Sequence, residues 1–133
     1  MAVQVAYQHP LDLNKRVAVG VSIPFNGLIA FNPTYTTTEQ IKSNLINFIL
    51  TNKGERVLNP NFGSDFRRFI FENITESNLR ALEIKLINDI KTNFSSVNVI
   101  SITLTPAYET NAIQLDIVYS IYSSEAQNIT IIF

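Results

Sequence analysis

Residues 97–133 have the sequence VNVISITLTPAYETNAIQLDIVYSIYSSEAQNITIIF, and their pattern determines which fold class the chain can adopt. The apolar residues are mostly β-branched and recur at every second position, which is the period of a strand with one buried face. Three strands are expected at residues 99–104, 113–121 and 129–133, with turns at 106–111 and 123–128. The pattern therefore predicts an antiparallel meander.

The first of these strands has an ambiguous register. Val97 and Val99 occupy odd positions, whereas Ile100, Ile102 and Leu104 occupy even ones. A slip of one residue moves side chains to the opposite face of a sheet. Either a β-bulge interrupts this strand or both of its faces are buried.

Upstream of the strands, apolar residues recur at helical spacing and predict three helices. Thr36 followed by Glu39 is the pattern of a capping box, so the first helix should begin there. Gly54 is expected to end this helix as its C′ residue. The second helix should begin near Ser64–Asp65, whose oxygens can cap free N–H groups, and should end near Asn73.

The third helix should begin at Thr75 and carry Lys91 in its last turn, where the helix dipole favours a cation. The residues expected to face inward are Ile41, Leu45, Phe48 and Ile49 in the first helix, Phe66, Phe69 and Ile70 in the second, and Leu79, Leu82, Ile84, Leu86, Ile87 and Ile90 in the third. Helices followed by an antiparallel meander define an α+β fold.

The N-terminal part predicts one more strand. Apolar and small residues alternate over 17–23, and Asn26-Gly27 suits a tight turn that returns the chain through residues 28–31. This strand could extend the C-terminal sheet, although an ordered loop is the alternative, because Gly20 and Pro24 weaken a ladder. We expect residues 1–133 to form a single domain with residues 1–16 as an extended N-terminal arm.

Composition limits the classes of function. Of 133 residues, 46% are hydrophobic and 16% are charged, the formal net charge is -1, and there is no Cys. A core of this size needs no disulfide or metal, and the weak net charge argues against nucleic acid or an anionic membrane as a partner. No apolar run reaches the ~18 residues that span a bilayer. We expect no cofactor.

Few residues suggest catalysis. His9 is the single histidine, so a relay of histidines or a site with several His ligands cannot form within one chain. An acid pair drawn from Glu55, Asp65 and Glu72 would suit a glycosidase, but these residues are better explained by a turn, a helix cap and a solvated helix position. Arg67–Arg68 is better explained by a solvated helix face or a partner salt bridge than by nucleic acid. The chain is therefore not expected to be an enzyme.

Residues 51–65, TNKGERVLNPNFGSD, stand out as a structured connection between two helices. Phe62 can fill the core, and Gly63 suits a backbone conformation that other residues resist. We expect Arg56 to bridge the carboxylate of Asp65 or Glu72 and so to lock the connection.

The motifs of this connection resemble a known family. The chain resembles the baseplate wedge family of contractile phage tails in four motifs. They are Pro24-Phe25, Gly54-Glu55-Arg56, Pro60-x-Phe62-Gly63 and Phe71-Glu72-Asn73. The family includes the related baseplate component of type VI secretion systems, and the similarity spans most of residues 17–133. The structural motif that it implies comprises Gly54, Glu55, Arg56, Pro60, Phe62, Gly63 and Asp65.

The resemblance implies a sheath initiator, a subunit held by the inner baseplate wedge whose sheet accepts extended arms of the first sheath ring. The partners would be the tail sheath protein, inner wedge proteins and, as a further candidate, tube or hub proteins, in a virion baseplate assembled in the host cytoplasm. Strand addition needs an exposed edge. Ile129, Ile131 and Phe133 are the candidate edge residues, although this last strand could also be internal.

The sequence departs from the family at one element. Relatives often carry Glu-Pro-Arg after the long helix, whereas residues 92–96 here are Thr-Asn-Phe-Ser-Ser, so Phe94 is the candidate apolar anchor on the wedge. Two other functions stay open. One is a muralytic, lysozyme-like baseplate enzyme, and the other is a regulatory protein-binding module of the same fold.

Overall fold

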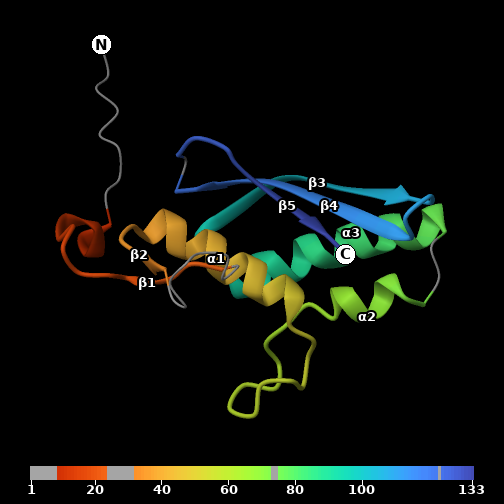
Figure 1. The fold of residues 1–133 in the computed structure, drawn as a ribbon, viewed down its shortest axis with the longest axis horizontal. Helices are drawn as coiled ribbons and strands as arrows, with labels where there is room; N and C mark the ends of the chain where they lie inside the picture. Colours follow the sequence, from red (N-terminus) through yellow and green to blue (C-terminus); the bar gives the residue numbers. More distant parts are fainter. Residues whose placement is uncertain (1–8, 24–31, 73–74, 123) are drawn as a thin grey trace. The chain divides into compact units, whose positions relative to one another are not determined.

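The computed structural model describes residues 9–23, 32–72, 75–122 and 124–133 (Figure 1). The chain divides into two compact units, residues 1–47 and 48–133. Each unit is described separately below. Among the residues described, no helix combines the length and the hydrophobicity needed to span a membrane.

The first unit contains a short antiparallel ladder. Strand β1 (Gly20–Val21) pairs with β2 (Pro33–Thr34), with Gly20 opposite Thr34. The strand expected over 17–23 is therefore reduced to two residues, and it pairs beyond the arm expected at 28–31. That arm and the turn at Asn26-Gly27 lie outside the described residues.

Helix α1 (Thr37–Leu50) begins in the first unit and ends in the second. The Thr36 hydroxyl accepts a hydrogen bond from the Glu39 N–H at 3.3 Å, which confirms the predicted start. Glu39 reaches back to the N–H of Tyr35 rather than to that of Thr36. A second cap comes from the 3₁₀ helix η1 (Pro10–Leu13), because the Asp12 carboxylate accepts from the Thr37 N–H at 2.7 Å and from its hydroxyl at 2.8 Å.

The second unit contains helices α2 (Phe66–Ile70) and α3 (Glu76–Asn93) and a three-stranded sheet. Strands β3 (Val97–Ala107), β4 (Ala112–Ile121) and β5 (Gln127–Ile132) form an antiparallel meander with β4 in the centre. The predicted α+β class is confirmed. The pair β1–β2 forms its own sheet, so the N-terminal strand does not extend the meander.

The register of β3 explains its mixed pattern. Pairing with β4 shifts between Val99 and Ser101, so of the two predicted alternatives the β-bulge is the one present. Val97 on one side of the bulge is buried, as are Ile102 and Leu104 on the other. One extra residue thus keeps the apolar side chains of both segments on the same face.

The core of the second unit lies between the inner face of this sheet and α3, which runs along the sheet (Figure 1). Alternate residues of β4 are almost fully buried, and α3 contributes one buried stripe. The buried side chains are Ile113, Leu115, Ile117 and Tyr119 in β4 and Leu82, Leu86 and Ile90 in α3. The expected stripe on α3 was too wide, since Ile84 is 62% exposed.

Candidate functional site

The two edges of the three-stranded sheet differ in their accessibility to a partner strand. On the β3 edge, the outward N–H of Leu104 donates to Glu83 Oε1 of α3 at 3.2 Å. Pro106 has no N–H to offer, and the bulge near Val99 distorts the ladder. Helix cover, proline and bulges are the devices that block strand addition. The β3 edge is therefore closed to a further strand.

The β5 edge has a regular pattern of backbone groups. Ile113 and Phe133 exchange two hydrogen bonds, with N–O distances of 3.2 and 3.0 Å, so their backbones face each other. Because hydrogen-bonded pairs alternate in an antiparallel ladder, Ile131 and Ile129 also direct their N–H and C=O groups toward β4. The groups of Asn128, Thr130 and Ile132 consequently point away from the sheet, and they meet no other strand of the described chain.

The residues expected to form this edge need a correction of one position. Ile129 is 2% exposed, and the Phe133 ring lies 5.1 Å from that of Phe66. Ile129, Ile131 and Phe133 therefore bind within their own sheet through both backbone and side chain. The groups available to a partner belong to the alternate residues, which only the hydrogen-bond register with β4 identifies.

Strand β5 also lacks the usual protection of an exposed edge. Residues 127–133 contain no charge and no Pro, and Ile132 is 70% exposed. The carboxylate nearest in the ladder is that of Asp116 on β4, which accepts from the Thr130 hydroxyl at 2.6 Å and from Gln114 at 2.7 Å. These bonds, Thr130 first, lower the pKa of Asp116 and hold its charge against the outer face of the sheet.

Residues 51–65 form a closed loop between α1 and α2 that projects away from the sheet of its unit (Figure 1). The Gly54 N–H donates to the Pro60 carbonyl at 2.7 Å, which closes the loop. The Glu55 carboxylate accepts from the backbone N–H of Asn52 at 3.1 Å and from its side-chain amide at 2.8 Å. Gly54 has φ 91° and lies four residues beyond the last residue of α1, so it forms part of this turn and is not the C′ residue.

Arg56 contacts an aromatic ring and forms no salt bridge with Asp65 or Glu72. Its guanidinium lies 4.0 Å from the centroid of the Phe62 ring, a cation–π contact. The Asp65 carboxylate instead accepts from the Lys53 N–H at 2.7 Å. The expected ion pair is absent, because the guanidinium of Arg56 lies over the Phe62 ring.

Phe62 joins an aromatic cluster, as its predicted core position requires. Its ring lies edge-on to Phe48 at 5.3 Å, and Phe48 lies edge-on to Phe94 at 5.4 Å. Phe94 is thus half-buried in this cluster, and only the accessible portion of its ring could contact a partner. The apolar anchor expected at Phe94 is therefore less available than its sequence position indicates.

The end of the loop depends on backbone geometry. Gly63 has φ 127°, and a Cβ there would lie 2.5 Å from the Thr51 carbonyl oxygen, so only Gly fits. Ser64 Oγ accepts from the Phe66 N–H at 3.3 Å and donates to the Ile49 carbonyl at 3.0 Å. Ser64 therefore caps the start of α2 and also satisfies the end of α1, whereas Asp65 makes no cap bond with its side chain.

The candidate catalytic residues do not form a site. His9 Nδ1 accepts from the Leu11 N–H within η1. The carboxylates of Glu55 and Asp65 are bound to amides of the loop. A groove of about 310 Å³ between α2 and α3 contains one acid, Glu72, beside Lys85 and apolar side chains. No group of three His, Cys, Asp or Glu residues that could bind a metal occurs in the described part of the chain.

Together, the fold and the edges define a small α+β module in which one edge of the three-stranded sheet is closed and the other is open. The chain is similar to the baseplate wedge protein gp25 of Enterobacteria phage T4, with 26% identity over 81 residues. The match covers 61% of this chain and 61% of the phage protein, so it falls short of the whole relative. No family model matches the chain.

Two solved structures share the fold. A protein from Geobacter sulfurreducens, named as a candidate tail lysozyme, superposes with a TM-score of 0.67 and 23% identity over 74% of this chain and 90% of that protein. A chain of the anti-feeding prophage baseplate gives a TM-score of 0.61 and 20% identity over 78% of this chain and 81% of that one. The similarity to the phage protein confirms the predicted resemblance to contractile-tail baseplate wedge proteins, and the two solved structures confirm the fold.

Proposed function

We propose that this protein is a structural subunit of a contractile-tail baseplate that joins the inner wedge and templates the first sheath ring. The observation that carries the proposal is the contrast between the two edges of the sheet. Glu83 and Pro106 close the β3 edge, whereas the outward groups of Asn128, Thr130 and Ile132 are available on β5. An extended arm of a sheath subunit would add to β5 as a fourth strand.

The energetics of strand addition fit this role. Three outward residues offer three N–H and three C=O groups, and each bond formed contributes about 1 kcal/mol net. The exposed Ile132 side chain adds an apolar contact on the outer face. Several such bonds hold one arm weakly, and a ring of identical arms multiplies that strength. This arrangement suits a template that acts once during assembly.

The other parts of the proposal concern location and partners. The subunit would reside in the tail baseplate after assembly in the host cytoplasm and would contact wedge and sheath proteins. Similarity to a phage wedge protein and to a prophage baseplate chain supports this location.

A muralytic activity, which the name of the Geobacter relative suggests, would need an acid pair. Glu55 and Asp65 are poor candidates, since both carboxylates accept hydrogen bonds from backbone amides.

A charge placed on the β5 edge tests the proposal. Ile132→Lys should reduce the fraction of tails that carry sheath by about tenfold or more, because an edge lysine disfavours strand addition and each lost buried bond costs about 1–3 kcal/mol. The matched control is Ile84→Lys, since Ile84 is 62% exposed on α3 and Ile132 is 70% exposed. Electron microscopy of tails counts those with sheath.

A second variant tests the outward backbone groups of β5 separately from the side chain of Ile132. Thr130→Pro removes one outward N–H and keeps the backbone hydrogen bonds between β4 and β5, although it also removes the side-chain bond from Thr130 to Asp116. It should give the same assembly defect. Thermal unfolding followed by circular dichroism confirms that each variant folds. Normal sheath assembly on folded Ile132→Lys and Thr130→Pro proteins would contradict the templating role of β5.

A further inference from the structure

The most exposed apolar residues of the described chain lie at the tip of the loop between α1 and α2. Val57 is 94% exposed and Leu58 is 100% exposed, whereas the next most exposed large apolar residue, Phe71, is 79% exposed. We propose that this tip is a second docking element, which inserts Val57 and Leu58 into an apolar pocket bordered by carboxylates on a neighbouring baseplate protein. This inference rests on the proposed baseplate role.

The loop presents its tip from a rigid base. The Gly54–Pro60 hydrogen bond closes the loop below the tip, and the Glu55 carboxylate binds both amide groups of Asn52. Arg56, directly before Val57, is held over the ring of Phe62. A base fixed in this way lowers the ordering cost of binding, so the tip is preorganised for a fitted pocket.

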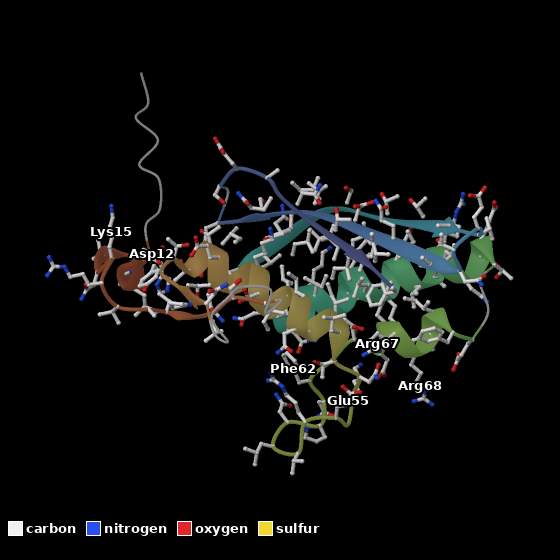
Figure 2. All side chains as sticks on the ribbon, viewed as in Figure 1. Asp12, Lys15, Glu55, Phe62, Arg67 and Arg68 are labelled. Carbon is white, nitrogen blue, oxygen red and sulfur yellow. The ribbon has the colours of Figure 1, made fainter. Side chains whose placement is uncertain are left out.

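The charges around the tip indicate the chemistry of the partner. Residues 53–68 hold four cations (Lys53, Arg56, Arg67 and Arg68) and two acids (Glu55 and Asp65), a net charge of +2 in a chain whose total is -1. Both acids are engaged with amides of the loop, and all four cations are exposed. Figure 2 shows Arg67 and Arg68 on α2 beside the loop that carries Glu55 and Phe62. Such a surface complements an acidic rim.

A protein pocket explains these features better than a bilayer or a second copy of the chain. The tip offers two aliphatic side chains and no Trp or Tyr, whereas even one long acyl chain gives only marginal membrane binding. A symmetric contact between two copies through this tip would bring the four cations of each copy together. An apolar anchor within a polar and charged rim is instead the usual anatomy of an interface between different proteins.

Photo-crosslinking in assembled tails tests the inference. A benzophenone amino acid is placed at position 58 in one variant and at position 132 in another, and both are irradiated in purified particles. We expect position 58 to crosslink to a baseplate protein other than the sheath, at a peptide that contains apolar residues and Asp or Glu. Crosslinks from position 132 with none from position 58 would contradict this inference and leave the proposed function standing. Absence of the protein from particles would instead defeat the proposed function.

Substitution gives a second readout. Val57→Ser combined with Leu58→Ser should lower incorporation into particles about tenfold or more, while Ile84→Ser, at an exposed aliphatic residue of α3, should leave it unchanged. Arg67→Glu combined with Arg68→Glu should lower incorporation and weaken its dependence on salt. Full incorporation of the folded double Ser variant would contradict the inference.

Two further outcomes would also contradict it. One is a crosslink from position 58 to a second copy of this chain. The other is cosedimentation of the purified protein with phosphatidylglycerol–phosphatidylcholine vesicles that the double Ser variant loses. A crosslinked peptide without acidic residues would contradict the proposal that carboxylates border the partner's apolar pocket.

Discussion

At the scale of single residues, Tyr119 is the least satisfied polar group of the core. It is 0% exposed in β4, and its hydroxyl has no hydrogen-bond partner in the described part of the chain. Desolvation by burial raises the pKa of Tyr119 to about 12. A buried hydroxyl without a partner costs about 1–3 kcal/mol of folding free energy.

Replacing Tyr119 by Phe should therefore stabilise the protein by about 1 kcal/mol at pH 7. The phenol ionises above pH ~10 in the unfolded chain but only above about 12 in the folded protein, so the wild type loses stability as the pH rises between these values. The Phe variant should escape that loss. Urea unfolding at pH 7 measures the expected gain in stability, and unfolding at pH 11 measures the avoided loss. A Phe variant less stable than the wild type at pH 7 would contradict the expected gain.

At the scale of elements, the loop between α1 and α2 contains two glycines with positive φ in different surroundings. Gly54, at φ 91°, has no atom within 4 Å of an added Cβ, whereas Gly63, at φ 127°, would place its Cβ against the Thr51 carbonyl. Gly54→Ala should lower the free energy of unfolding by about 1–2 kcal/mol, from backbone strain alone. Gly63→Ala should cost more, because the backbone must also move. Urea unfolding compares the two, and equal losses would rule out the close contact.

The sequence predicted those features of the elements that depend on local patterns. Nearby residues predicted the strands of the meander, the bulge as one of two alternatives, and the starts of α1 at Thr36 and of α3 near Thr75. The end of α1 did not, because Ser64 binds the Ile49 carbonyl from 15 positions away. Likewise, the Asp12 cap of Thr37 joins residues 25 positions apart. Such contacts leave no periodic signal in sequence.

The edge of the sheet could be predicted only in part. The composition of residues 127–133 indicated a strand without charge, but strand order came from the structure. Apolar periodicity marks side chains that face the core, and so it selected Ile129 and Ile131. In β5 the residues with outward backbone groups are the alternate ones, because Ile113 pairs with Phe133. Hydrogen-bond register, and not hydrophobicity, determines this property.

At the scale of the whole molecule, the charge distribution supports a role within an assembly. The described residues contain no salt bridge, and 16% of the full sequence is charged. The exposed side chains of Lys53, Arg67 and Arg68 are therefore available to a partner, and the β5 edge carries no charge of its own. An isolated protein gains little from either feature, whereas a subunit contacted on two surfaces uses both. The identity of the proposed partners could not be predicted from the sequence, since it depends on surfaces of other chains.

A subunit that templates a symmetric ring must be present in a fixed number of copies. Quantitative mass spectrometry of purified particles should therefore find this protein at a low copy number that is a multiple of the rotational symmetry of the baseplate. The same particles made with Ile132→Lys should retain this copy number while losing sheath, because the proposed docking element at Val57 and Leu58 lies outside β5. A variable copy number, or peptidoglycan hydrolysis that is lost in Glu55→Gln or Glu72→Gln, would instead support a carried enzyme over a structural template.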